Sequence, residues 1–205
     1  MTSLIDSLSE VSPEIVRSLA DRLGEPSDSI RKALQTSAAT MLGAIAGRTN
    51  EPAFMSQVTN MIIAFGRSHL AGSVEAGSAF LATLFGRDRP VVEKKIAEAA
   101  GLRTPPAAAV LASAAPLLMG LLAPKITSTS LERIVTDDQP RFLSLIPAGV
   151  PGLSRLPGFA ASAAVAGGRH RSDANAGKHW LWQVLLLGAL LIAALVWYSY
   201  RGSST

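Results

Sequence analysis

The chain of 205 residues contains no cysteine. Disulfide bonds, thiol chemistry and cysteine-ligated metal sites are therefore excluded. The three histidines, His69, His170 and His179, are not spaced as paired metal ligands, so we interpret them as solvated or interfacial side chains. The sequence predicts no metal site and no cofactor.

Recognisable catalytic motifs are also missing. Adjacent residues on a helix point apart, so Asp137 and Asp138 are more typical of a helix cap than of paired catalytic carboxylates. Gly72 and Gly77 have the spacing of a phosphate-binding loop, but the Lys and Ser/Thr that such a loop requires do not follow. We therefore predict no catalytic residue, no nucleotide site and no small-molecule substrate, and we do not expect an enzyme.

The first 146 residues carry no excess charge, because 14 Lys or Arg balance 14 Asp or Glu. The net charge of +4 arises entirely after Pro147. A basic segment next to a membrane is attracted to anionic lipids by about 1 kcal/mol per residue, which accounts for the charge without nucleic acid. We expect the lipid bilayer, not nucleic acid, to be the partner of this region.

The most specific signal is an apolar run near the end of the printed sequence. The 22 residues between Lys178 and Arg201 carry no formal charge. A helix of ~20 such residues spans the hydrocarbon layer, and aromatic side chains favour its two interfaces. The aromatic residues are Trp180 and Trp182 at one end and Trp197, Tyr198 and Tyr200 at the other. The pattern predicts a single transmembrane helix over residues 180–200.

Basic residues flank this predicted span unevenly. Arg169, Arg171 and Lys178 precede it, whereas Arg201 alone follows. Since positive residues stay on the cytoplasmic side, the N-terminal body is expected in the cytoplasm and residues 201–205 outside. A span in this position would insert after translation, as a tail anchor.

Residues 1–146 are predicted to form one all-helical domain, a compact bundle. Ser12-Pro13-Glu14 is typical of a helix start, and apolar residues then recur with a helical period until Gly24. Pro116 is expected to bend or interrupt a later helix. Residues 147–179 are rich in Pro, Gly and Ala and are interpreted as a flexible linker with a basic juxtamembrane end.

The body contains an internal repeat. Residues 19–46 align without gaps on residues 96–123, so that Gly24 pairs with Gly101 and Gly43 with Gly120. Each copy reads as a short helix, a glycine stop, a Ser or Thr cap and a longer helix with a small residue late in it. Caps, stops and apolar positions match in register, which favours an internal duplication.

Two runs connect these features to a known family, SAFLATLFG at Ser78–Gly86 and AAPLLMGLLA at Ala114–Ala123. With the glycine-stopped helices, they make residues 15–146 resemble the YidB-like bacterial family of unknown function. The resemblance implies a compact helical bundle and supplies no catalytic residues. Larger proteins of this kind carry a periplasmic OmpA-like domain that binds peptidoglycan after the span. The printed sequence ends at Thr205 without one, so no cell-wall role is carried over.

These features suggest three functions. The first is a membrane-tethered, non-catalytic interaction or scaffold module in the bacterial inner membrane, with a protein partner or a homo-oligomer. The second is a carrier or sensor that binds an apolar ligand inside the Ala- and Gly-rich bundle. An enzyme is the third and least favoured.

The uneven basic flanks lead to a topological prediction. A reporter that is active only in the periplasm should be active when fused after Thr205 and inactive when fused at Met1. The measurement is reporter activity in intact bacteria. The reverse pattern would contradict the orientation inferred from Arg169, Arg171 and Lys178.

Overall fold

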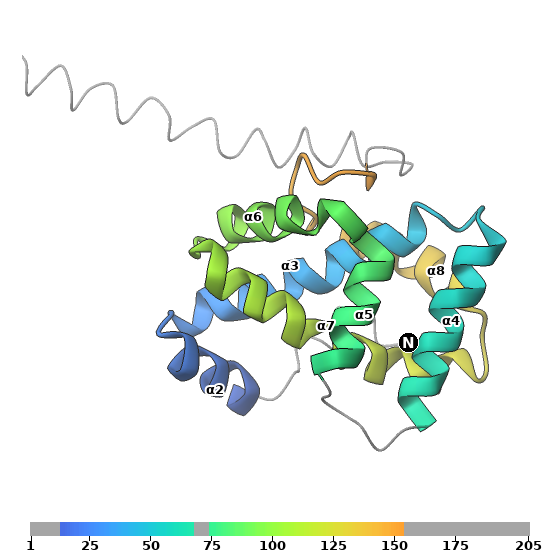
Figure 1. The fold of residues 1–205 in the computed structure, drawn as a ribbon, viewed down its shortest axis with the longest axis horizontal. Helices are drawn as coiled ribbons and strands as arrows, with labels where there is room; N and C mark the ends of the chain where they lie inside the picture. Colours follow the sequence, from blue (N-terminus) through green and yellow to red (C-terminus); the bar gives the residue numbers. More distant parts are fainter. Residues whose placement is uncertain (1–12, 68–73, 154–205) are drawn as a thin grey trace, which may run out of the picture. The chain divides into compact units, whose positions relative to one another are not determined.

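The computed structural model describes residues 13–67 and 74–153 of the chain (Figure 1). Regular secondary structure in these residues is entirely helical, which confirms the predicted all-α fold. The elements are α2 (Pro13–Leu23), α3 (Ser27–Ala46), α4 (Pro52–Arg67), α5 (Val74–Phe85), the 3-10 turn η1 (Gly86–Asp88), α6 (Arg89–Ala100), α7 (Thr104–Ile126) and α8 (Leu131–Leu143). The predicted membrane helix at 180–200 and the predicted tail at 201–205 lie outside the described residues.

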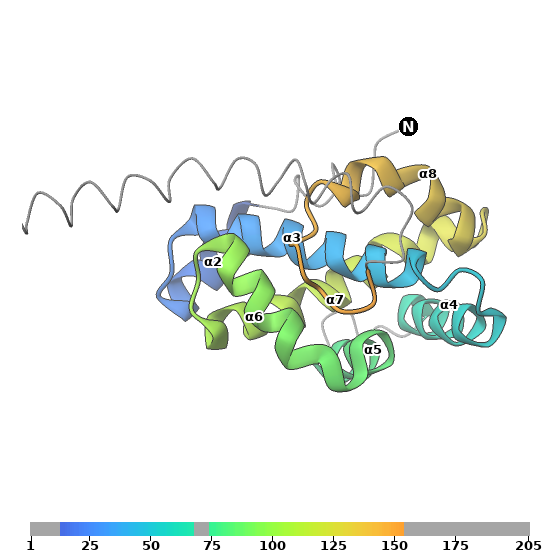
Figure 2. The same cartoon turned by 90° about the horizontal axis from the view of Figure 1, so that it is seen from above.

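Helices α3 and α7 form the centre of this body and pack against each other (Figures 1 and 2). α3 also contacts α2, α6 and α8, whereas α7 also contacts α4, α5 and α6. Both central helices carry apolar or small residues around most of their circumference. A helix of this composition is stable only when neighbours cover it on every side.

The outer helices are amphipathic instead, and α4 shows the pattern clearly. Its buried side chains recur every three or four positions, whereas Gln57 is exposed. This spacing places them along one stripe that faces the core. The buried residues are Phe54, Val58, Ile62 and Phe65.

α7 is the one helix in the described ranges that is long and apolar enough to cross a membrane. It has 23 residues and a mean hydropathy of 1.8 over its most apolar window. More than half of that window is buried among the other helices. Its hydropathy is therefore also that of a core helix, and composition alone does not distinguish the two.

Pro116 lies within α7 without interrupting it, because the helix runs on to Ile126. Proline has no N–H to donate to the carbonyl of Ala112, so this turn lacks one helical hydrogen bond. Gly77 of α5 packs here: a Cβ at Gly77 would lie 3.0 Å from Pro116 Cδ and 3.1 Å from Ala112 O. The weakened turn of α7 and the glycine of α5 thus meet closely.

The joints α2–α3 and α6–α7 have the same backbone geometry. Gly24 has φ +64° and Gly101 has φ +69°, both left-handed. After each glycine, the next N–H donates to the carbonyl five residues earlier, at 3.2 Å in the first joint and 2.9 Å in the second. This is the bonding of a glycine-terminated helix. The predicted duplication is thus repeated in local structure, 77 residues apart.

The predicted Ser and Thr caps of these joints are wrong. Pro26 and Arg103 occupy the extended N-cap positions, and neither makes a side-chain cap hydrogen bond. Ser27 and Thr104 are already the first helical residues. From that position a hydroxyl cannot cap its own helix, because the cap bond requires the extended backbone of the preceding residue.

The late glycines of the two repeats have different surroundings. A Cβ at Gly43 would lie 2.6 Å from Ile146 Cδ1 and 3.5 Å from both δ carbons of Leu153. The nearest atom to a Cβ at Gly120 is Phe65 Cε1, at 3.9 Å. The repeat thus preserves the glycine but not its role.

The residues that cover Gly43 belong to a segment that follows α8, which we call the strap (residues 145–153). Ile146, Val150 and Leu153 are buried in the core, although the strap has little regular structure. Figure 2 shows it as the orange segment that crosses α3. The packed body therefore extends to Leu153 and does not end at the predicted boundary of residue 146. The remainder of the predicted linker, residues 154–179, lies outside the described residues.

The left-handed joints predict a matched loss of stability. Gly24→Ala and Gly101→Ala should each lower the free energy of unfolding by about 1 to 2 kcal/mol, because an L side chain disfavours φ near +65°. No atom lies within 4 Å of either Cβ position, so the loss is one of backbone conformation. Urea unfolding followed by circular dichroism measures it. Gly101→Asn, which tolerates this conformation, should lose less; an equal loss would point to another cause.

The late glycines predict opposite effects of the same substitution. Gly120→Ala should stabilise the protein by about 0.5 to 1 kcal/mol, because alanine is the better helix former and has space. Gly43→Ala should destabilise it by about 1 kcal/mol or more, since overpacking against Ile146 outweighs the same gain. The same urea titration tests both. Stabilisation by both substitutions would contradict the tight contact of the strap.

Candidate functional site: two hollows that meet at Arg48

The site residues predicted from sequence fall into two groups. The aromatic residues of the predicted anchor and the basic residues Arg169, Arg171 and Lys178 lie outside the described residues, as do the three histidines. The repeat glycines are placed in helix joints and packing contacts, and they do not converge on a cavity. A candidate site has to be sought elsewhere in the body.

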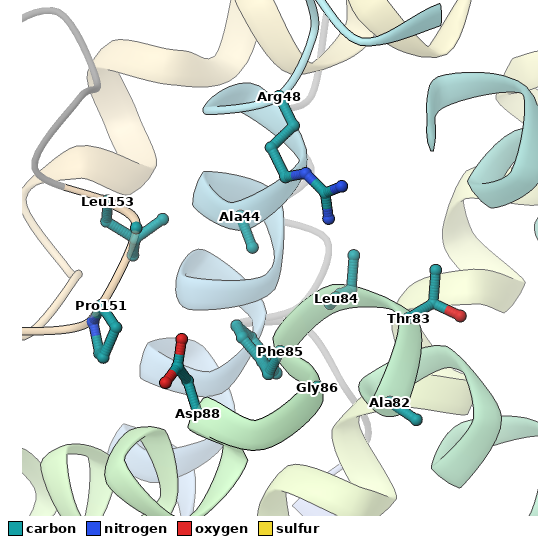
Figure 3. Close-up of a pocket in the computed structure, with 11 residues that line it drawn as sticks. Ala44, Arg48, Ala82, Thr83, Leu84, Phe85, Gly86, Asp88, Pro151 and Leu153 are labelled. Atoms are coloured by element: carbon teal, nitrogen blue, oxygen red, sulfur yellow. The ribbon is translucent and has the colours of Figure 1, made fainter. Parts of the chain in front are cut away.

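Two hollows adjoin at the end of α3. The strap hollow has a volume of about 310 Å³ and lies between α3, the corner of α5 and η1, and the strap (Figure 3). The α4 hollow has a volume of about 380 Å³ and is lined by the start of α4 and the turn before it. Both are open to solvent, and Arg48 and Thr83 line both. The two hollows are thus neighbours that share the side chains of Arg48 and Thr83.

Arg48 lies in the turn just after α3, and its side chain is held on two sides. Its Nε and Nη2 donate to Glu51 Oε2 at 3.0 and 2.7 Å. Its Cζ lies 3.6 Å from the centroid of the Phe54 ring, a cation–π contact. The backbone closes the same turn, because Glu51 N–H donates to the Arg48 carbonyl at 3.0 Å. The guanidinium is therefore fixed in place while 39% of the side chain stays exposed.

The walls of the strap hollow are mainly apolar and its charges lie at the rim. Phe85 and Leu153 contribute buried side chains, and Pro151 lies beside them. Asp88 is exposed and lies apart from Arg48 in Figure 3. The hollow thus offers an apolar surface bordered by a cation and an anion. This arrangement can hold an apolar side chain of a peptide and orient the charges next to it.

Other charges of the body form mostly local pairs on the surface. Arg89 and Glu93 pair at 2.8 Å, and Lys95 and Glu98 at 2.9 Å. The hydrogen bond from Lys95, together with the positive charges of Lys95 and Lys94, holds the pKa of the Glu98 carboxyl below its usual value. The Lys95–Glu98 pair is exposed and the Arg89–Glu93 pair is partly buried. Local surface pairs of this kind contribute little to stability.

An ion pair joins the two repeats. Arg103 Nε donates to Glu25 Oε1 at 3.0 Å, across 78 positions of sequence. Each residue lies in the joint of one repeat, one or two positions after the left-handed glycine. The two joints are thus neighbours in space, which sequence alignment alone does not predict.

Among the described residues, no group of three or more His, Asp or Glu side chains is arranged to hold a metal ion. Sequence reasoning missed Arg48 and Phe54. In the sequence, Arg48 reads as a residue of an ordinary surface turn and Phe54 as an ordinary core residue of a helix. The one available signal was Glu51, three residues after Arg48 and directly before the proline that begins α4.

Comparison with known proteins matches one family model. The model describes a bacterial protein of unknown function and covers residues 6–125, more than half of the chain. It includes both repeats and ends within α7, so that α8 and the strap lie beyond it. No curated protein and no solved structure matches the chain. The predicted resemblance to a bacterial family of unknown function is thus confirmed. The YidB-like name and the C-terminal anchor stay predictions.

Proposed function

The chain belongs to DUF937, a family of bacterial proteins of unknown function, and we propose that it acts as a membrane-tethered, non-catalytic interaction module. The observation that carries the proposal is the pair of open hollows that meet at Arg48. An extended segment of a partner would lie along them, with an apolar side chain against Phe85 and an acidic group near Arg48.

The fixed position of Arg48 supports this role. Binding requires side chains at an interface to lose conformational freedom, which opposes association by about 0.5 to 1.5 kcal/mol per side chain. Arg48 already contacts Glu51 and Phe54 in the free body, so it has less freedom to lose on binding than an arginine without such contacts. Arginine next to an apolar, partly buried surface is also typical of residues that dominate interface energies.

The tether is the part of the proposal that comes from sequence. A span at residues 180–200 and basic residues before it would confine the body to a thin layer beside the inner membrane. Confinement raises the effective concentration of partners in the same membrane, which makes weak contacts sufficient. The open hollows suit such weak and reversible contacts.

A carrier or sensor of apolar ligands is the less favoured alternative. Ligand pockets usually enclose 70–90% or more of a drug-sized molecule. Both hollows are open, and the strap hollow has charges at its rim. We therefore favour a peptide segment over an enclosed lipid-like ligand, and an interaction module over an enzyme.

Site-specific crosslinking in membranes tests the proposal. A photo-crosslinking residue at Ala82, which is exposed and lines the strap hollow, should trap one defined product, either a partner or a second copy. The same residue at Thr136, exposed on α8, should not. Arg48→Glu should lower capture at Ala82 by about tenfold, equivalent to ~1.4 kcal/mol. Deletion of residues 178–205 should lower it as well.

The charge-matched control is Arg133→Glu, on the exposed side of α8. This variant should leave capture unchanged, since it alters the net charge equally and lies away from the hollows. Equal capture at Ala82 and Thr136, or equal loss with both glutamate variants, would contradict a specific site at Arg48. A monomeric full chain that converts a metabolite would favour the enzyme instead.

A further inference from the structure

The chain leaves the described part of the body at the strap hollow. Leu153, the last described residue, lines the hollow with a buried side chain, and Pro151 lines it as well. Figure 3 shows Phe85 between these two strap residues on one side and Ala82 on the other. The segment that follows Leu153 therefore starts at one wall of the hollow, next to an apolar surface.

A charge at the rim of the strap hollow has no partner in the described body. Asp88 lines the hollow and is exposed, yet its carboxylate makes no ion pair and no hydrogen bond among the described residues. Arg48, by contrast, pairs with Glu51 at 2.7 Å. A carboxylate of this kind beside an apolar wall favours an occupant that carries both a cation and an apolar side chain.

The residues directly after the strap have this composition. Residues 154–159 read SRLPGF, and Arg155 is the first charged residue after Leu153. The sequence LPGF at residues 156–159 has proline and glycine at the two central positions, as a type II turn favours. Such a turn reverses the chain and directs Phe159 back toward the body. When extended, this segment reaches up to about 20 Å, which exceeds the width of a hollow of about 310 Å³.

We propose that residues 154–159 occupy the strap hollow of their own chain. Phe159 then lies against Phe85, an aromatic pair that contributes more than its burial alone. Arg155 lies beside Asp88 and pairs with its carboxylate. The hollow, at about 310 Å³, is near the lower end of the range for ligand pockets and suits one aromatic side chain. Because the connection is short, the effective concentration of the segment at the hollow is on the order of millimolar.

The regulatory consequence of this occupancy rests on the proposed function. A partner that places an apolar side chain against Phe85 has to displace Phe159 first. The apparent Kd of the partner therefore rises by the inverse of the fraction of bodies whose strap hollow is empty. The α4 hollow and Arg48 stay open, so a partner can make its first contact there. The start of the predicted linker thus acts as a built-in competitor that admits only partners with enough affinity.

The absence of cysteine allows a direct test with full-length protein in lipid vesicles. Ala82→Cys and Ala160→Cys in one chain place one thiol at the exposed rim of the hollow and the other next to Phe159. Mild oxidation should close a disulfide within the chain, seen as a faster band on a non-reducing gel. Thr136→Cys with Ala160→Cys measures random collision, because Thr136 is exposed on α8 and lines neither hollow. This control pair should close about tenfold more slowly.

Matched substitutions in the Ala82–Ala160 cysteine pair separate binding from mere proximity. Phe159→Ser should slow closure about fivefold, because it removes the side chain that fills the hollow. Leu156→Ser removes an apolar side chain from the same segment and should slow closure less than about twofold. Asp88→Arg should slow closure about two- to threefold, as expected for an exposed ion pair, and Arg155→Asp in the same chain should restore it. No effect of Asp88→Arg would overturn that pairing.

The outcomes separate this proposal from the broader function. Equal closure rates of the Ala82 and Thr136 pairs, or equal slowing by Phe159→Ser and Leu156→Ser, would overturn occupancy of the hollow by residues 154–159. A disulfide between two chains that carry the single cysteines would place a second copy's segment there instead.

These measurements need no partner, so they do not depend on the proposed function. In the photo-crosslinking experiment, Phe159→Ser should raise capture of a partner at Ala82 about threefold, because the hollow is then empty more often. Unchanged capture would show that the segment does not compete with the partner. If no partner is captured in any variant, the interaction module is wrong, whereas rapid closure that depends on Phe159 would still establish the occupancy.

Discussion

The packing of this body depends on one constraint, that α3 must be covered on every side. From Ala33 to Ile45 nearly every residue of this helix is buried, including the hydroxyl residues Thr36, Ser37 and Thr40. Thr40 satisfies its hydroxyl by donating to the Thr36 carbonyl at 2.7 Å, whereas Ser37 Oγ has no partner among the described residues. A hydroxyl buried in this way opposes folding. Small side chains offset the cost, because they let neighbouring helices approach closely.

The cover of α3 comes from two parts of the sequence. α6 and all of α7 except its last residue lie within the family-matched residues, whereas α8 lies beyond them. The strap adds its apolar side chains at Gly43, where Ile146 and Leu153 supply the three atoms nearest to a Cβ at that position. The centre of the family-matched domain is thus completed by residues that the family model does not include. A boundary drawn from sequence at residue 146 would divide this cover between Ile146 and Val150.

Much of the fold could be predicted from sequence because it depends on local chemistry. Apolar residues with a helical period predict helices, and glycine after such a run predicts a left-handed stop, as at Gly24 and Gly101. The caps were mispredicted by one residue, because Pro26 takes the extended position that Ser27 was expected to hold. Cap positions depend on one pair of backbone angles, which composition does not determine.

The strap and the site at Arg48 could not be predicted in the same way. A stretch rich in proline and glycine is typical of a linker, and nothing in its composition shows that Ile146 meets a glycine more than 100 positions earlier. The contact of Arg48 with Phe54 and the pairing of Glu25 with Arg103 likewise depend on how helices come together. Long-range partners of this kind follow from tertiary packing and leave no periodic signal in the sequence.

The hydropathy of α7 has a consequence for how the protein is made. A nascent helix of this length and hydropathy resembles a membrane segment to the machinery that inserts such segments. The helices that pack against α7, from α3 to α6, precede it in the chain, so they have left the ribosome before α7 emerges. The order of the elements thus offers α7 packing partners as soon as it emerges, so that burial in the body competes with membrane insertion from the start.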